Sequence, residues 1–416
     1  MERKLILYIL PLFALAILID FLIDVIKKTN RYRIPDSITS LSAGFLGTTA
    51  GLLTIGFVGF FYSGVFRWLH IFDVKDTVWS WVLAAVIYDF FYYWYHRAHH
   101  RINFLWAIHA THHNSEYFNF TTALRQSALG FLTVWPFFLP MAFLGFSYEH
   151  YLFAAGLSTL YGFFTHTEFV RFVPYLELIL VGPSSHRVHH GINPRYVDKN
   201  YGSIFIVWDH VFGTHAYESK KDKICYGTGS ALNSFNPFWA NLSLYWSLLN
   251  DMYFCKSWKD KFTIWFKKTG WRPEDRRYIK NANKKNIGTF KIYDKKINSA
   301  ESSYVIVSFI FATLSVVHLM FSAKYYSTLW VFVYVLLIWS VLLSNSFFMD
   351  GKTYRFKYEN IRLIIIGIFS FYAVNNTSNL VDSYWFNFVF IASCTFSLGW
   401  VALYIYKYNN LANSVR

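Results

Sequence analysis

The stretch "HRAHHRINFLWAIHATHH", residues 96–113, decides the fold, because six of its eighteen residues are histidine. It directly follows the apolar run "VIYDFFYYWY" of residues 86–95. His96 and His100 are four residues apart, and the HxxHH group of His109, His112 and His113 follows. Residues at these spacings share one face of a helix. The stretch therefore predicts a membrane helix whose end aims several imidazoles at a common point.

The composition is that of a polytopic membrane protein. Of the 416 residues, 55% are hydrophobic and 22% aromatic, more than a soluble domain usually carries. Cys225, Cys255 and Cys394 form no CxxC pair, which argues against disulfides and thiolate metal sites. The expected fold is an all-α transmembrane bundle with about nine spans, the first of them a retained N-terminal helix. The spans are predicted at residues 4–26, 42–66, 78–95, 128–146, 149–167, 304–322, 328–348, 361–375 and 384–406.

The positive charge of the chain indicates which ends of these spans face the cytoplasm. Of its 39 lysines and arginines, 34 fall on the side that also receives the histidine-rich stretch. Long loops count little in the positive-inside rule, but 13 remain against 5 when the 21 charges of residues 168–303 are set aside. We expect the histidines on the cytoplasmic side, and we attribute the net charge of +15 to an anionic leaflet. No nucleic-acid partner is expected.

A second histidine group repeats the HxxHH spacing far downstream. It is "SSHRVHHG", residues 184–191, and a further histidine lies in "FFTHTE", residues 163–168. All of these residues fall on the expected cytoplasmic side, close to span ends. Neutral imidazole suits iron, zinc and copper, and eight or nine ligands exceed what one ion uses. The pattern therefore predicts two metal ions in a cytoplasmic lobe, held by His96, His100, His109, His112, His113, His186, His189 and His190, with His166 as an additional candidate.

Other histidines and one aromatic segment have less specific interpretations. His99 points about 100° away from His100 on a helix, so we expect it beside the site or on the surface. Five scattered histidines are interpreted as polar anchors or surface residues: His70, His150, His210, His215 and His318. Residues 236–273 mix aromatic residues with lysine. They indicate helices that lie in the membrane interface or, equally, an amphipathic segment packed on the protein.

The histidine motifs resemble those of the membrane-bound fatty acid hydroxylase superfamily, which includes sterol desaturases. HxxxH (His96, His100) and the two HxxHH groups carry the resemblance. Residues 92–127, "FFTHTE" and residues 186–215 are most similar to the branch of this superfamily that oxidises alkylglycerols. The resemblance covers about residues 80–275 and implies a helical membrane bundle with a metal-bearing cytoplasmic lobe.

The resemblance also implies a chemistry. It implies that the histidines named above bind two iron ions and that molecular oxygen oxidises a membrane lipid, with electrons from a protein of the ferredoxin type or from tetrahydrobiopterin. Arg101 stands where the alkylglycerol-oxidising branch has glutamate, which puts the pterin in doubt. Ser185 stands where that branch often has another histidine, a change that the metal set can survive.

Five polar residues within or beside these segments are candidates for hydrogen-bonding the ligand histidines and so orienting them. Asp89 lies inside the third predicted span, seven residues before His96, where it could hydrogen-bond a ligand histidine or a tyrosine or, equally, have a purely structural partner. The others are Glu116, Asn119, Arg125 and Glu168, for which helix capping or ion pairing is an alternative. Trp208 and Asp209 are expected to be structural.

The expected function is that of an oxygen-dependent di-iron monooxygenase, most similar to enzymes that cleave the ether bond of alkylglycerols to an aldehyde and glycerol. A hydroxylase or desaturase of sterols, fatty acids or carotenoids is the alternative, and a metal-ion transporter is a remote one. We expect N-terminal helices over residues 1–77, a catalytic domain over 78–300 and C-terminal helices over 301–416. We expect the host membrane to be the bacterial inner membrane or the endoplasmic reticulum.

Overall fold

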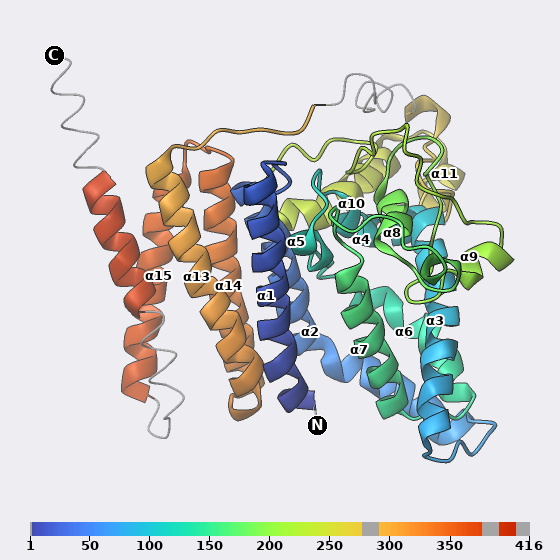
Figure 1. The fold of residues 1–416 in the computed structure, drawn as a ribbon. Helices are drawn as coiled ribbons and strands as arrows, with labels where there is room; N and C mark the ends of the chain where they lie inside the picture. Colours follow the sequence, from blue (N-terminus) through green and yellow to red (C-terminus); the bar gives the residue numbers. More distant parts are fainter. Residues whose placement is uncertain (1, 277–290, 377–390, 405–416) are drawn as a thin grey trace. The chain divides into compact units, whose positions relative to one another are not determined.

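The protein is all-helical, as expected. The computed structural model describes residues 2–276, 291–376 and 391–404, and within these ranges it contains helices and three isolated β-bridges but no β-strand (Figure 1). The long helices are α1 (Glu2–Lys27), α2 (Ile34–Leu69), α3 (Val78–Arg101), α7 (Tyr148–Phe164), α10 (Pro237–Phe254), α13 (Ser299–Ser322), α14 (Thr328–Met349) and α15 (Arg355–Asn376). The shorter ones are α4 (Asn103–His113), α5 (Phe120–Ala123), α6 (Phe131–Phe143), α8 (Pro183–His190), α9 (Val207–Val211) and α11 (Trp258–Thr263).

These helices form two compact units. The first comprises residues 1–47, 54–233 and 239–293, and the second residues 48–53, 234–238 and 294–416. The predicted domain boundaries at residues 77 and 300 stay predictions.

Three helices in the described part of the chain are long and apolar enough to cross a membrane: Ile9–Lys27, Ser299–Tyr325 and Thr328–Met349. A fourth crossing is possible if Ile34–Thr54 and Gly56–Leu69, which meet at a bend of 53°, count as one span. The protein is therefore an integral membrane protein with several apolar helices. Helix α6 is only 13 residues long, roughly 20 Å, against the roughly 30 Å of a bilayer core. Part of the ninth predicted span lies outside the described residues.

Helix α3 is the central element of the first unit and packs against α4, α6 and α7. Thr77 begins it with a capping box, its hydroxyl accepting from the Ser80 backbone N–H, which satisfies a donor that the first turn leaves free. Tyr88 on α3 stacks on Phe138 of α6, with 4.5 Å between ring centroids. Met141 and Ala154 complete this buried core. The core fixes the direction of α3, and so the place of the histidines at its end.

A tight turn joins α6 to α7. Gly145 has a φ of +93°, a conformation that favours glycine. A Cβ atom at this position would lie 1.9 Å from the carbonyl oxygen of Phe72. The turn therefore depends on glycine both for its backbone conformation and for its close approach to the segment between α2 and α3.

In the second unit, α13 and α14 pack side by side and α15 packs on α14. A buried ion pair of Glu359 and Arg362 lies within α15. Tyr304 of α13 and Ser344 of α14 both donate hydrogen bonds to Glu359. The carboxylate thus joins three helices at one end of this unit.

The packing predicts a sharp contrast between two phenylalanines of α6. Phe138 is 1% exposed in the core, whereas Phe143 is 44% exposed. Phe138→Ala should lower the free energy of unfolding by about 3–5 kcal/mol, because it leaves a cavity in a packed core. Phe143→Ala should change it by less than about 1 kcal/mol. Thermal unfolding of the purified protein in one detergent measures both, and equal losses would show that α6 is not packed as described.

Candidate metal centre

The end of α3 and the start of α4 are held by a short segment that reverses the chain. Ile102 is extended and separates the two helices. The amide of Asn103 donates to the carbonyl oxygen of Ile264 at 2.8 Å, and its backbone N–H donates to that of Lys267 at 3.0 Å. These bonds to a distant segment fix the turn, so that the histidines of α3 and α4 face each other.

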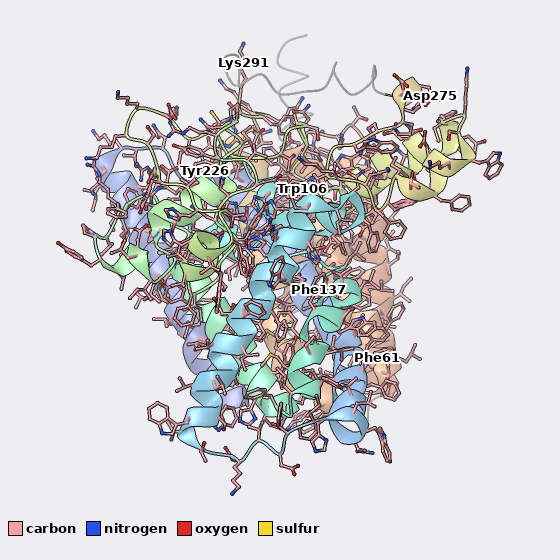
Figure 2. All side chains as sticks on the ribbon, turned by 90° about the vertical axis from the view of Figure 1, so that its right-hand side faces the viewer. Phe61, Trp106, Phe137, Tyr226, Asp275 and Lys291 are labelled. Atoms are coloured by element: carbon pink, nitrogen blue, oxygen red, sulfur yellow. The ribbon has the colours of Figure 1, made fainter. Side chains whose placement is uncertain are left out.

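Five of the predicted ligands converge on one point: His96 and His100 from α3, His109 and His113 from α4, and His189 from α8. The Nε2 atom of His113 lies 3.2 Å from that of His100 and 3.1 Å from those of His109 and His189. The Nε2 atoms of His109 and His96 are 2.9 Å apart. We call these residues the five-histidine group. Figure 2 shows their nitrogen-rich region beside the labelled Trp106, whose ring centroid lies 5.0 Å from that of His100.

The remaining four converge on a second point: His112 from α4, His166 from the segment just after α7, and His186 and His190 from α8. The Nε2 atom of His166 lies 3.0 Å from that of His186 and 3.3 Å from that of His112. We call these residues the four-histidine group. The sequence suggested His166 only as an additional candidate, and the structure places it between two of the motif histidines.

The two HxxHH motifs interleave the groups. In α4, His109 and His113 belong to the five-histidine group and His112 to the four-histidine group. In α8 the division is reversed, with His189 in the first group and His186 and His190 in the second. The first and last histidines of each motif are four residues apart and share a helix face. The middle histidine, His112 or His189, points in a neighbouring direction. Each motif therefore serves both points.

Backbone carbonyl oxygens fix the tautomers of several rings. The Nδ1 atoms of His96, His112 and His189 lie 2.8 Å, 2.9 Å and 3.0 Å from the carbonyl oxygens of Tyr201, Arg125 and Lys199, respectively. That of His166 lies 2.7 Å from the carbonyl oxygen of Gly162. A carbonyl oxygen only accepts hydrogen bonds. In each neutral ring Nδ1 therefore carries the proton, and Nε2 has a free lone pair.

The arrangement of these lone pairs fits a bound cation. The facing Nε2 atoms of His166 and His112 are both acceptors, so no hydrogen bond can join them. The Nε2 atom of His190 is buried without a hydrogen-bond partner. Buried polar atoms rarely stay unsatisfied in proteins, and a metal ion accepts such lone pairs. Both groups therefore have the donor set and the orientation of metal sites. Assignment of the individual histidines as ligands stays a prediction.

Burial keeps the imidazoles neutral, the form that binds metals. It lowers the pKa of His112 to about 4 and that of His189 to about 3. Burial, and then the neighbouring imidazoles, also lower the pKa of His109, His113 and His190 well below the ordinary range. Protons therefore do not compete for these nitrogens at neutral pH.

Two buried carboxylates hold the loop that supplies Tyr201. Asp89 accepts hydrogen bonds from the backbone N–H groups of Ile204 at 2.7 Å and Phe205 at 3.1 Å, and from the indole of Trp208 at 2.9 Å. Of the two expectations for Asp89, these bonds match the structural partner rather than a bond to a ligand histidine or a tyrosine. Its carboxylate fixes the loop whose Tyr201 carbonyl oxygen bonds the Nδ1 atom of His96.

Asp209 anchors the same loop from the other side. Its carboxylate accepts from the backbone N–H groups of Tyr201 and Gly202, both at 2.8 Å, and from the Thr214 hydroxyl at 2.7 Å. The structural role expected for Asp209 agrees with these bonds. Its contribution to holding a histidine through the Tyr201 carbonyl was not foreseen, because the sequence gives no signal for a backbone acceptor.

The other four polar candidates have different contacts. Arg125 reaches His112 through its backbone carbonyl, while its buried guanidinium donates to Thr111 and Asn114. Burial lowers the pKa of this guanidinium to about 10. Asn119 caps α5, Glu168 pairs with Arg31 at 3.0 Å, and Glu116 accepts from the backbone of Tyr293. For Asn119 and Glu168, capping and ion pairing are thus the contacts observed.

His99 and the two positions that depart from the expected pattern are also resolved. His99 is buried, with Nδ1 2.7 Å from the Tyr95 carbonyl oxygen and Nε2 3.0 Å from the Thr133 hydroxyl, so a surface position is wrong. Arg101 forms an exposed ion pair with Asp198 at 3.0 Å. The Ser185 hydroxyl bonds the backbone of Gly182 and caps α8.

Comparison with known proteins agrees with this site. Residues 81–214 match the family model described as fatty acid hydroxylase, a range that contains all nine histidines. The chain is 35% identical to alkylglycerol monooxygenase of Danio rerio over 363 residues, which cover 86% of this chain and 80% of the relative. The chain belongs to the fatty acid hydroxylase family. It is also 36% identical to alkylglycerol monooxygenase of Homo sapiens over 265 residues, 63% of this chain and 59% of the relative.

A more distant relative is the ornithine lipid hydroxylase OlsE of Rhizobium tropici, 31% identical over 141 residues, which cover 32% of this chain and 40% of the relative. No solved structure matches the chain. Membership in the fatty acid hydroxylase family makes the protein an oxidoreductase of the monooxygenase class that acts on lipids, rather than a metal-ion transporter.

Two buried histidines of similar surroundings should behave differently toward metal. His112→Ala removes an Nε2 atom from the four-histidine group, so we expect the bound iron per chain to fall. His99→Gln, whose ring bonds Tyr95 and Thr133, should leave the iron content unchanged. Metal analysis of anaerobically purified protein, together with a melting curve for each variant, makes the comparison. Equal loss in both variants would contradict the grouping.

The Asp89 carboxylate predicts an effect on metal binding at a distance. In Asp89→Asn, an amide NH₂ group meets N–H donors that the carboxylate accepts. The loop that presents the Tyr201 carbonyl to His96 should loosen, and iron affinity should fall about 10- to 100-fold, as for other residues behind metal ligands. Competition with a coloured chelator measures the dissociation constant. An unchanged constant would show that the loop does not need this anchor.

Proposed function

We propose that the protein is an oxygen-dependent enzyme that cleaves the ether bond of alkylglycerols in its membrane. The two histidine groups, with lone pairs fixed toward two points, are the main support for this proposal. Relatives named alkylglycerol monooxygenase, which align over most of the chain, point to the substrate class.

The reaction balances with one oxygen molecule, two electrons and two protons. One oxygen atom enters the C–H bond next to the ether oxygen, and the other leaves as water. The resulting hemiacetal collapses when its carbon–oxygen bond to glycerol breaks, giving an aldehyde and glycerol. Two iron ions, one held by each histidine group, would supply the oxygen activation that amino-acid side chains cannot.

The chain's own residues set the conditions for this chemistry. Eight of the nine histidines are buried. The four rings whose Nδ1 atoms bond backbone carbonyls present a bare nitrogen rather than N–H to the two points. Phe118 covers one side of the four-histidine group, stacking on His166 at 5.2 Å and on Tyr226 at 5.1 Å between centroids. These rings exclude water from the nitrogens. The segment of residues 201–214, which Asp89 and Asp209 hold, fixes the five-histidine group through the Tyr201 carbonyl and His96.

The proposal includes the membrane arrangement expected from the sequence. About nine spans would place both histidine groups on the cytoplasmic side, in a bacterial inner membrane or the endoplasmic reticulum. The substrate would then reach the site from the cytoplasmic leaflet. The catalytic region would correspond to residues 78–300, flanked by the helices of residues 1–77 and 301–416.

The electron donor is proposed to be either a tetrahydrobiopterin or a protein of the ferredoxin type. Arg101 does not leave a lone positive charge beside His100, because it pairs with Asp198. The substitution of glutamate by arginine is therefore compensated locally, which keeps the pterin among the candidates.

A hydroxylase that leaves its lipid intact is the second candidate. The resemblance to ornithine lipid hydroxylase favours it. Oxygen insertion away from an ether oxygen would give a stable alcohol instead of a hemiacetal. The two candidates share the oxidation step and differ in which carbon is presented to it.

Product analysis should separate these candidates. Iron-loaded protein in detergent is given an alkylglycerol, oxygen and either tetrahydrobiopterin or a reduced ferredoxin. We expect one aldehyde released per two electrons supplied, and at least a hundredfold less in His112→Ala, since ligand and active-site changes commonly cost this much. A stable hydroxylated lipid without aldehyde would replace ether cleavage by hydroxylation. Consumption of neither lipid nor oxygen by fully loaded protein would refute both.

A further inference from the structure

We propose that the outer face of α10 and α11 is a platform that binds the membrane surface and its anionic headgroups. This inference goes beyond the proposed function, because it requires only that the protein is embedded in a bilayer. It concerns where the histidine groups lie relative to the lipid, and which part of the chain sets that depth.

The platform consists of large apolar side chains that point away from the protein. Between 42% and 76% of each side chain is exposed, and they are Trp246, Leu249 and Tyr253 of α10, Trp258 and Phe262 of α11, and Phe266 just beyond it. The residues in each helix are three or four positions apart, so they share one face. Figure 2 shows aromatic rings projecting from this segment close to Asp275. An exposed apolar patch of this kind marks an interaction site.

The opposite face of α10 is also apolar but packs on the protein. Leu248 is buried with Ala107 of α4 and Ile264 after α11. When a helix is apolar on both faces and only one face packs on the protein, the other face needs a different apolar environment. Helix α10 is not among the described helices that are apolar and long enough to span a bilayer. The interface, where Trp and Tyr rings are favoured, is therefore the fitting environment.

Positive charges border this apolar face. Lys256, Lys259, Lys267 and Lys268 are exposed on the same segment. The ammonium of Lys261 lies 5.5 Å from the Trp258 ring, so lysine and aromatic side chains alternate at the surface. Lysines near a bilayer strengthen binding to an anionic leaflet. This charge pattern points to lipid rather than to a second copy of the chain, whose identical lysines would repel.

The platform is hydrogen-bonded directly to α4, the helix that carries three of the motif histidines. The Thr111 hydroxyl and the Asn114 amide both donate to the carbonyl oxygen of Ala240, at 3.3 Å and 3.2 Å. The Asn103 amide donates to Ile264 at the other end of α4. Helix α4 is thus fixed to the platform at both ends. The depth of the platform in the headgroup layer therefore sets the depth of His109, His112 and His113.

Spin labels on the full chain in nanodiscs test this placement. Cys225, Cys255 and Cys394 are replaced by alanine, and one label is attached at Phe262→Cys or, as a matched control on the same helix, at Lys259→Cys. Collision rates are measured with oxygen, which concentrates in lipid, and with a water-soluble nickel chelate. The discs contain either phosphatidylcholine alone or phosphatidylcholine with phosphatidylglycerol. Bound iron confirms that each labelled protein is folded.

We expect the ratio of oxygen to nickel collisions to be several-fold higher at position 262 than at position 259. Phosphatidylglycerol should raise the ratio at position 262 further, and replacement of Lys256, Lys267 and Lys268 by glutamine should remove that increase. Equal ratios at both positions would overturn the proposal. So would dipolar broadening between labels at position 262, because a second copy of the chain would then cover the face. Neither result would affect the aldehyde assay of the proposed function.

Discussion

Nine neutral imidazoles brought together inside a protein are unfavourable unless something accepts their lone pairs. The rest of the first unit depends on this constraint. Helices α3, α4 and α8 present Nε2 atoms to one another at about 3 Å, and backbone carbonyls hold several of the rings with their protons pointing away. A folded chain could avoid the cost by turning any one ring over, but the carbonyl bonds oppose this. The architecture thus directs the lone pairs toward cations.

The carbonyls that hold the rings are themselves held by buried carboxylates. Asp89 and Asp209 each accept three hydrogen bonds from the loop of residues 201–214. These donors offset part of the desolvation of the two carboxylates, and a buried charge usually needs such partners. A polar shell of this kind gives the histidines a fixed geometry without placing a carboxylate among them. The site therefore differs from carboxylate-rich di-metal sites, since its donors are imidazoles.

Much of the site could be predicted from spacing, and the reasons for the remainder are physical. The HxxxH and HxxHH patterns identified which residues lie together at the site, because helix geometry places positions three and four apart near one another. Within each HxxHH motif the two histidines four apart also share a group. How the groups combine across α4 and α8 depends on how these helices cross, which periodicity within one helix does not contain. The partner of Asp89 lies 115 residues away, and its donors are mainly backbone groups, so side-chain identities carried no signal for it. Asn119 and Glu168 were candidates because they lie within the segments that resemble the family. Asn119 caps α5 and Glu168 pairs with Arg31, and a role behind the ligands stays a prediction for both. The all-helical fold followed from composition, whereas the number of crossings did not, since α6 and α7 are shorter than a full span.

The interleaving of the two histidine groups has a consequence for how metal is acquired. Helices α4 and α8 each contribute to both points. If each point takes one ion, as proposed, an ion bound at one point would restrict the same two helices that the other point requires. The conformational entropy of that restriction would be lost only once, and the second ion would bind a helix pair that is already arranged. Binding should then be positively cooperative, and at limiting metal a population of chains should divide into empty and doubly loaded molecules with few in between. A cell short of metal would in this way keep fewer, fully equipped molecules rather than many half-filled ones.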